Sequence, residues 1–356
     1  MRVESLRDRI YASLALAGIG DALGAPTEQW SRAEIATAYG GLATTFRTPT
    51  EDTFAGVNAG RCAEVTDDAS QMYYLARALA ANGGRLDTPG WIACLLDWVE
   101  HSPKAGFMGP STAGIVKALQ EGSDLALVGV IGRSRRKLTS LGTTNGAAMR
   151  VAPAGLVHPG DVEAACAQAL ATCLPSHDTE VAISAACSIA AAVAQALVTD
   201  SLPDVIAAAL QGARIGERLG REHGRVVAGP SFLARLEAAL TIADTARSVE
   251  EVLSRMEALV GNSVLAAESV PAAVGLLAYA KGEPLLTVAL GASVGNDTDS
   301  IATMAGAIAG ALAGTAALPQ DLLAQFIAAN AADFDLGRLA DDLTPIAWSR
   351  LQNRQP

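Results

Sequence analysis

Aromatic residues make up only 4% of the 356 residues, and the chain lacks segments in which β-branched residues alternate with polar ones. Both features are common in β-strands, so their scarcity argues against a sheet-rich fold. Half of the residues are hydrophobic, which is enough to form a large core and excludes a disordered chain. Alanine, leucine and glutamate fill long stretches between glycines, prolines and asparagines, a composition typical of helices.

Basic residues are also in the minority, with 26 lysines and arginines against 37 aspartates and glutamates and a net charge of −11. Such a balance repels phosphate backbones and anionic membranes, so we expect no nucleic-acid and no membrane partner. The five cysteines form no C-x-x-C pair. We therefore expect reduced thiols in a cytoplasmic protein, without a disulfide framework or a thiolate zinc site.

Uncharged segments that approach the length of a membrane span occur twice, at 181–199 and 301–319. Both consist mostly of alanine with glycine, serine, threonine or glutamine, and contain few large apolar residues. Small side chains let helix axes approach closely, so both segments are predicted to be close-packed central helices. Residues 1–9 alternate in charge and show no targeting signal.

Helices are predicted almost throughout, and no proline- or serine-rich linker divides them, which indicates one all-α domain over residues 1–356. Capping residues support helix starts at Thr88, Asp161, Ser201 and Ser248. The one long segment without periodicity, 40–60, is expected to be a functional loop. The predicted helices are 5–18, 66–81, 88–102, 111–120, 146–155, 161–173, 179–199, 201–220, 231–245, 248–259, 269–280, 284–294 and 299–314.

The first indication of chemistry is the run Thr66-Asp67-Asp68 at the start of a predicted helix. A helix N-terminus favours acidic side chains, so a charged cap is one explanation. A cap needs only one aspartate, however, and adjacent carboxylates repel each other. A metal site is the other explanation, and this run alone leaves both open.

A second acidic run, Asp297-Thr298-Asp299-Ser300, leads into the apolar part of a predicted helix, which starts at Ile301. Buried carboxylates require positive charge, and residues 282–337 contain no lysine or arginine. Hard divalent cations take oxygen ligands, which fits carboxylates and a hydroxyl without neighbouring histidine or cysteine. If the two runs converge, their four aspartates can neutralise two divalent cations.

Six short motifs follow one another along nearly the whole chain. They are GIGDALGAPTE (18–28), VTDD (65–68), GPST (109–112), NGAAMRVAP (145–153), ESVP (268–271) and GNDTDSIA (295–302). In this order they resemble the ADP-ribosylglycohydrolase family. That family includes the glycohydrolase that reactivates dinitrogenase reductase and the hydrolases of ADP-ribosyl-arginine and ADP-ribosyl-serine.

The resemblance implies an orthogonal helical bundle around a dinuclear metal cleft that holds two Mg²⁺ or Mn²⁺ ions. It implies Glu28 and Asp68 as catalytic residues; without the family pattern, Glu28 would be a surface carboxylate after a turn. Asp21 is predicted to stabilise a turn over residues 18–24, with a position behind the metal ligands as the alternative. The implied metal ligands are Thr66, Asp67, Asp68, Asp297, Asp299 and Ser300.

Three residues depart from the family pattern. Ala69 stands where threonine is common, Asn296 where glycine is usual, and Ser300 where threonine is usual. None of these changes removes a ligand atom, but together they leave the substrate open. The amide of Asn296 is predicted to contact substrate near the leaving group. Alternatively, Asn296 occupies a left-handed turn position, which asparagine tolerates well.

Further substrate contacts are expected from the middle motifs, where small residues at 109–112 and 143–146 leave backbone N–H groups free to bind an anion. The alternative for each is a capped loop. His177 is expected either to line the cleft or to cap the following helix. The predicted substrate-binding residues are Gly109, Ser111, Thr112, Asn145, Gly146, Met149, His177 and Asn296.

These residues and the resemblance predict a metal-dependent hydrolase of a glycosidic bond to ribose, acting on an ADP-ribosylated protein or a small ADP-ribosyl compound. Glu28 would act as general acid or base, or hold the ribose. A nucleosidase acting on a small N-riboside is the alternative, since no arginine or lysine for binding a diphosphate stands beside the motifs. A non-catalytic, crystallin-like protein is the third hypothesis, against which the intact ligand positions argue.

Overall fold

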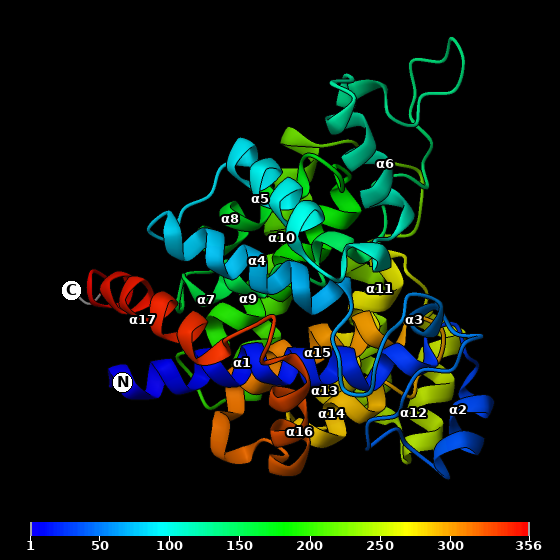
Figure 1. Ribbon diagram of the computed structural model, residues 1–356, viewed down its shortest axis with the longest axis vertical. Coiled ribbons are helices and arrows are strands. Elements are labelled where there is room, and N and C mark those ends of the chain that lie inside the picture. The colour runs from blue at the N-terminus through cyan, green and yellow to red at the C-terminus, as the bar shows by residue number, and fades with distance from the viewer. Residues whose placement is uncertain (1, 355–356) are drawn as a thin grey trace.

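Helices α1 (Val3–Gly24) and α15 (Thr298–Ala313) lie side by side at the centre of the fold, although they come from opposite ends of the chain (Figure 1). The computed structural model describes residues 2–354, and in it nearly all of α15 is buried. A methyl group at Gly20 or Gly24 would overlap the backbone of α15. Glycine at these positions therefore lets the two backbones touch, which brings the end of α1 against the start of α15.

The remaining helices surround this pair, and the described residues contain no β-sheet, which confirms the all-α prediction (Figure 1). A second buried helix, α9 (Glu180–Ala196), packs against α7, α8 and α10. The other helices are α2 (Arg32–Tyr39), α3 (Phe54–Val57), α4 (Asp67–Ala81), α5 (Thr88–His101), α6 (Pro110–Gln120), α7 (Ala152–Leu156), α8 (Val162–Cys173), α10 (Leu202–His223), α11 (Phe232–Thr245), α12 (Val249–Arg255), α13 (Ala266–Tyr279), α14 (Pro284–Gly291), α16 (Gln320–Asn330) and α17 (Leu336–Gln352).

The two uncharged segments form buried helices, as predicted, since they supply most of α9 and α15. Nowhere in residues 2–354 does a helix combine the length and the apolarity needed to cross a membrane. All five cysteines are free thiols, and only Cys62 is exposed. The four others pack as small apolar side chains, which agrees with the sequence analysis.

Side chains cap most of the predicted helix starts. Asp161, Ser201 and Ser248 each accept a hydrogen bond from the backbone N–H three residues later. The predicted cap at Thr88 is wrong by one residue, because the carboxylate of Asp87 accepts the N–H of Gly90. Thr88 is instead the first residue of the helix.

Three predictions about helix limits are corrected. The first helix does not end at residue 18 but continues to residue 24, so Asp21 lies on a helix and not in a turn. Its glycines lower helix propensity, but contact with α15 outweighs that cost. The predicted helix 146–155 divides into a 3₁₀ turn at Asn145–Ala147 and the short α7. Helices α2, α3, α16 and α17 were not predicted; in α17 the internal Pro345 interrupts the helical pattern.

Candidate active site

The N-terminal ends of α4, α6 and α15 meet at a cavity of about 350 Å³. Helix N-termini carry partial positive charge and unpaired N–H groups, so this cavity is suited to anionic groups. Its lining includes every residue that the sequence predicted for the site except Asn296. The lining residues are Glu28, Gln29, Phe54, Thr66, Asp67, Asp68, Phe107, Gly109, Pro110, Ser111, Thr112, Thr144, Asn145, Gly146, Met149, His177, Val264, Asp297, Asp299 and Ser300.

Asp21 fixes the start of α4 from inside the core. Its carboxylate accepts the backbone N–H of Thr66 (3.0 Å), the hydroxyl of Thr66 (2.9 Å) and the N–H of Ala69 (2.9 Å). Burial and the nearby charge of Asp299 raise the pKa of Asp21 to about 7, against the effect of these hydrogen bonds. Asp21 is therefore a positioning residue behind Thr66 and Asp67, which was the alternative in the sequence analysis.

Five carboxyl groups belong to the lining of the cavity: Glu28, Asp67, Asp68, Asp297 and Asp299. Burial raises the pKa of Asp299 to about 6. Burial and then repulsion by Asp299 raise the pKa of Glu28 to about 10, and they raise the pKa of Asp67, Asp68 and Asp297 well above the usual range. The charge of Asp299 is the largest cause after burial for each of the other four, so the five carboxyl groups share one electrostatic environment.

This group contains two buried oxygens without a hydrogen-bond partner, Oδ1 of Asp68 and Oδ1 of Asp299. A buried cation, Arg150, lies near Asp67 and Asp68, and burial lowers the pKa of Arg150 to about 10. One guanidinium cannot neutralise five carboxylates, whereas hard divalent cations would supply both charge and partners for the orphaned oxygens. The residues present therefore fit Mg²⁺ or Mn²⁺.

In residues 2–354, no group of three or more His, Cys, Asp or Glu side chains already has the geometry of a metal site. The carboxylates are gathered at one end of the cavity without forming a complete coordination shell. Metal binding therefore stays a prediction that rests on the charge and the unpaired oxygens of the group.

Pairing between two loops places Glu28 next to the start of α15. The N–H of Gln29 donates to the carbonyl of Asn296 (2.7 Å), and the N–H of Asn296 donates to the carbonyl of Trp30 (2.8 Å). Glu28 follows the 3₁₀ turn Ala25–Thr27 and is only partly buried. It is thus the one carboxyl of the group that is also accessible from solvent, as a group that exchanges protons must be.

Asn296 serves the turn geometry that the sequence analysis gave as its alternative. Its φ of 59° is in the left-handed region, and its backbone makes both hydrogen bonds of the loop pairing. Its side chain does not belong to the lining of the cavity. The predicted contact between its amide and a substrate therefore has no geometric support.

Asn145 connects the middle motif with the acidic group through its side chain. Its Nδ2 donates to Oδ2 of Asp297 (2.6 Å) and to Oγ of Ser269 (2.9 Å). Its backbone N–H donates to the carbonyl of Val264 (2.9 Å). The N–H of Asn145 is therefore not available to an anion, and the element that begins here is a 3₁₀ turn, Asn145–Ala147, so an anion site at residues 143–146 stays a prediction.

A chain of buried hydrogen bonds leads away from the acidic group. Asp67 accepts Nε2 of Gln71 (3.3 Å), whose carbonyl oxygen accepts Nη1 of Arg150 (3.0 Å). Arg150 also donates to Oγ of Ser176 (3.2 Å) and stacks over Trp91, 4.6 Å from the ring centre. The sequence analysis did not identify Arg150, although it lies inside the motif 145–153.

The same chain reaches His177 on another wall of the cavity. Nδ1 of His177 contacts the hydroxyl of Ser176 (2.8 Å), and Nε2 contacts the hydroxyl of Thr144 (3.0 Å). Burial lowers the pKa of His177 well below its usual value, so the imidazole is neutral. Its role is to line the cavity, because the cap of α9 is Thr179.

The start of α6 has the predicted geometry for an anion. Gly109 is the N-cap and has no side chain to block the approach, and Pro110 has no N–H. The N–H groups of Ser111 and Thr112 belong to the first turn and have no acceptor within the helix. Because both residues line the cavity, these N–H groups are available to a bound anion.

Part of the cavity lining is apolar. Phe54 of α3, which is 41% exposed, and Phe107 contact each other edge to face, with ring centres 6.3 Å apart. Met149 and the partly exposed Val264 also contribute to this part of the lining. The predicted functional loop 40–60 therefore does reach the site, through Phe54.

A family model described as ADP-ribosylglycohydrolase matches residues 2–351, almost the full length. The chain belongs to the ADP-ribosylglycohydrolase family. This result confirms the resemblance carried by the six motifs. It assigns the chain to a family of hydrolases and agrees with the position of those motifs around one cavity.

Relatives of this family member include an uncharacterized protein, YegU, of Escherichia coli (strain K12), which is 32% identical over 332 residues, 92% of this chain and 94% of that protein. The ADP-ribosyl-[dinitrogen reductase] glycohydrolase of Rhodospirillum rubrum is 30% identical over 162 residues, 45% of this chain and 49% of that one. A solved ADP-ribosylglycohydrolase-related protein complex is similar in fold, with a TM-score of 0.64, 19% identity, and coverage of 97% of this chain and 99% of that chain.

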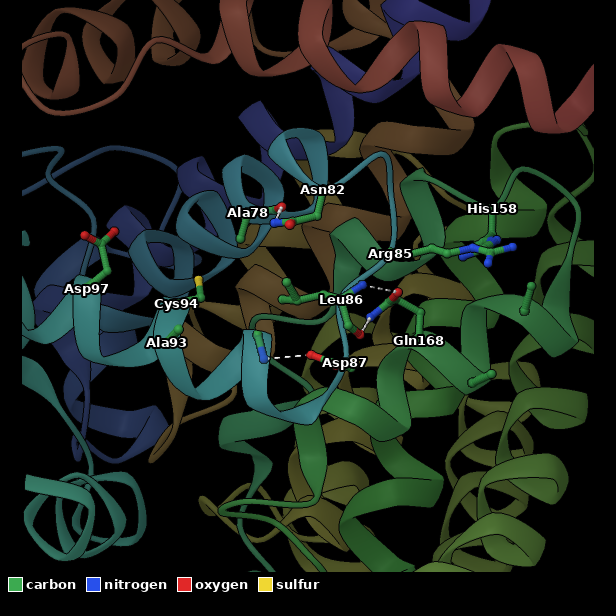
Figure 2. Close-up of a pocket in the computed structure, with 13 residues that line it drawn as sticks. Ala78, Asn82, Arg85, Leu86, Asp87, Ala93, Cys94, Asp97, His158 and Gln168 are labelled. Atoms are coloured by element: carbon green, nitrogen blue, oxygen red, sulfur yellow. Dashed lines mark hydrogen bonds between the residues drawn. The ribbon is translucent and has the colours of Figure 1, made fainter. Parts of the chain in front are cut away.

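A larger hollow of about 850 Å³ lies between α4, α5 and α8 of this ADP-ribosylglycohydrolase family member (Figure 2). Its polar side chains bind neighbouring parts of the chain. Gln168 pairs with both the N–H (3.1 Å) and the carbonyl (2.7 Å) of Leu86, and Asp87 caps α5. None of the described residues that line it has an unpaired buried polar atom. We therefore assign the active site to the smaller, acidic cavity.

Proposed function

We propose that this protein is a divalent-cation-dependent hydrolase that cleaves the glycosidic bond between ribose and its leaving group, with ADP-ribose on a protein side chain as the substrate. Five carboxyl side chains line one cavity, and this observation carries the proposal. They belong to Glu28, Asp67, Asp68, Asp297 and Asp299. Burying carboxylates whose oxygens lack hydrogen-bond partners lowers the stability of the folded protein. Such carboxylates at a cavity lined by helix N-termini are typical of metal-ion sites.

In this proposal two Mg²⁺ or Mn²⁺ ions are the cofactors. Bound there, they supply positive charge for the ribose hydroxyls and lower the pKa of water. Asn145 keeps Asp297 in one orientation through the 2.6 Å hydrogen bond that its amide donates. Asp21 holds the start of α4 by accepting a hydrogen bond from the hydroxyl of Thr66. The ligands would be Thr66, Asp67, Asp68, Asp297, Asp299 and Ser300.

Glu28 is proposed to exchange a proton with the leaving group or with the attacking water. It borders the acidic group but keeps contact with solvent, so its protonation can change during a reaction cycle. Cleavage at the anomeric carbon leaves electrons on the departing atom, which then needs a proton. Asp68, the second catalytic candidate, lies deeper and is buried, which suits a ligand better than a proton donor.

The rest of the cavity fits the ADP part of the substrate. The free N–H groups of Ser111 and Thr112 suit a diphosphate, and Phe54 and Phe107 provide an apolar surface for a base. The relative from Rhodospirillum rubrum supports this substrate class, since its name specifies an ADP-ribosyl group on a protein. We also propose a cytoplasmic location, in keeping with five free thiols.

One observation favours a second candidate, hydrolysis of a small N-riboside such as a nucleoside. Among the described residues, no lysine or arginine lines the cavity, so a diphosphate would rely on backbone N–H groups alone. A nucleoside, which has ribose and a base but no phosphate, would contact the same acidic group and the same apolar side chains.

A substrate panel decides between these candidates. The purified protein is expected to release ADP-ribose from ADP-ribosyl-arginine or ADP-ribosyl-serine peptides in Mg²⁺ or Mn²⁺, and to lose this activity in EDTA. Release of product can be measured by chromatography with adenosine, inosine and uridine as parallel substrates. Turnover confined to nucleosides would support the second candidate, and no turnover of any substrate would support a non-catalytic protein.

The Asp21→Asn variant tests the positioning role of Asp21. Asparagine has the size of aspartate, but an amide NH₂ replaces one acceptor oxygen. The N–H groups of Thr66 and Ala69 therefore lose part of their hydrogen bonding to this side chain. We expect the Mn²⁺ concentration for half-maximal activity to rise about 10–100-fold, as is typical when a residue that supports a metal ligand is changed. The matched control is Asp8→Asn, on the same helix, whose carboxylate accepts the N–H of Thr315 (3.1 Å). Equal Mn²⁺ dependence in both variants would contradict this role.

A further inference from the structure

A basic hairpin lies between two parts of the chain that line the cavity, the start of α6 and the turn at Asn145. The connection between α6 and the turn at Asn145 folds back on itself: the N–H of Leu138 donates to the carbonyl of Gly129 (2.9 Å), and Val130 and Lys137 form an antiparallel bridge. We call residues 129–138 the basic hairpin. It extends away from the helical body beyond α6 (Figure 1).

The tip of the basic hairpin concentrates positive charge in an acidic protein. Arg133, Arg135 and Arg136 are all exposed, and among the described residues none of them has an ion-pair partner. The chain has a net charge of −11, yet residues 125–160 contain no aspartate or glutamate. Unpaired cations on an exposed turn therefore stay available to an external anionic group.

The base of the hairpin is anchored beside the active site. Nζ of Lys137 donates to the carbonyl of Leu125 (2.9 Å) and to Oδ2 of Asp178 (3.4 Å). Arg225 donates to the same carboxylate (2.8 Å) and to the carbonyl of Leu141 (2.7 Å). Asp178 directly follows His177, which lines the cavity. The hairpin thus has a defined position relative to the cavity, while its arginines stay free.

The hairpin also exposes apolar side chains. Leu127, next to it, is 65% exposed, and Ile131 and Leu138 are 63% and 43% exposed. Arginine is enriched at protein–protein interfaces, and exposed apolar side chains beside it add surface that a partner can bury. Residues 121–144 contain no aromatic side chain, whereas single-stranded nucleic acid is usually bound by stacking on aromatic rings. The chemistry of this surface therefore favours an acidic protein segment over RNA.

We propose that the basic hairpin docks an acidic segment of the substrate protein while the ADP-ribosyl group of that protein enters the cavity. This proposal rests on the proposed function and specifies its substrate as a protein with acidic residues near the modified side chain. A nucleoside or a single ADP-ribosyl amino acid carries no acidic peptide segment, so the hairpin selects among macromolecular substrates only.

The test compares the parent with the triple variant Arg133→Gln/Arg135→Gln/Arg136→Gln. Substrates are synthetic peptides with the ADP-ribosyl linkage that the panel identifies, flanked by glutamates or by serines, and the matching ADP-ribosyl amino acid. We expect KM for the glutamate peptide to rise roughly tenfold in the variant, the order expected for three exposed charge pairs. We expect kcat and the kinetics of the ADP-ribosyl amino acid to stay unchanged. Unchanged KM for the glutamate peptide would overturn the proposal.

The matched control is Arg214→Gln/Arg218→Gln/Arg221→Gln on α10, which removes the same charge from exposed arginines (59%, 54% and 63% of the side chain). This control should keep the parental KM for the glutamate peptide. An equal rise in KM would overturn the proposal, since it would trace the effect to net charge.

Direct binding separates this proposal from the proposed function. Fluorescence anisotropy of an unmodified, labelled glutamate-rich peptide measures docking without any turnover. We expect binding by the parent at 50 mM NaCl, weaker binding at 300 mM NaCl and loss of binding in the hairpin variant. No binding by the parent, or hairpin-dependent binding of a 20-nucleotide RNA or of anionic vesicles in place of the peptide, would overturn the docking proposal. If the substrate panel failed while the parent still bound the peptide through the hairpin, the proposed function would be overturned and the binding of acidic segments by the hairpin would stand.

Discussion

The Asp299→Asn variant is expected to lose turnover and to bind Mn²⁺ at least about tenfold more weakly. After burial, the charge of Asp299 is the largest cause of the raised pKa of Glu28, Asp67, Asp68 and Asp297, so its loss removes a charge that acts on every other carboxyl group. The residues described here contain no cationic side chain that could take over the role of a metal ion, apart from Arg150 on one side. Calorimetric titration with Mn²⁺ measures the affinity directly.

The same variant has a second readout that does not depend on activity. At pH 8 in EDTA it should unfold at a higher temperature than the parent, because burial raises the pKa of Asp299 only to about 6 and a repelling charge is removed. Added Mn²⁺ should stabilise the parent more than the variant. Asp244→Asn, at an exposed carboxylate near the end of α11, is the control and should behave as the parent. Identical Mn²⁺ binding by parent and Asp299→Asn would contradict the metal site.

The Glu28→Gln variant is expected to lower kcat by a factor on the order of 10²–10⁴, with Mn²⁺ affinity changed much less than in Asp299→Asn. Glutamine keeps the size and polarity of Glu28 but cannot exchange a proton. Rates with saturating substrate and Mn²⁺ isolate this effect from binding, and calorimetry supplies the Mn²⁺ affinity.

Glu51→Gln is the matched control for this variant. Glu51 is an exposed glutamate in the loop that precedes α3, so its charge is lost near the site without any change to the acidic group. We expect the parental kcat for it. If Glu28→Gln also turned over at the parental rate, Glu28 would line the cavity without exchanging a proton in the reaction.

Much of the candidate site was predictable because its groups occur in short local runs. Thr66-Asp67-Asp68 and the run 297–300 each place acidic side chains at a helix start, where the structure confirms α4 and α15 begin. The start of α6 at GPST (109–112) was predicted in the same way. Helix starts depend on capping residues and on the residues of one turn, so local sequence is sufficient to locate them.

Other parts of the site depend on contacts between distant segments. Asp21 was assigned to a turn because glycines disfavour helix, and only the contact with α15 shows why α1 continues through them. Arg150 is a buried cation whose partners, Gln71 and Ser176, lie 79 and 26 residues away in the chain. Phe54 belongs to a helix too short to be recognised from periodicity.

The sequence by itself determined the all-α class, the family and all but one of the predicted residues around the cavity. Helix composition and capping determine secondary structure over a few residues, so they can be read from local sequence. A run of acidic residues likewise indicates that a positive charge must lie nearby in the folded protein. Only the tertiary structure shows that the two acidic runs line one cavity, that Asp21 supports the start of α4, and that Asn296 does not belong to the cavity lining. These features depend on which backbones touch, and the glycines of α1 permit a close approach without specifying its partner.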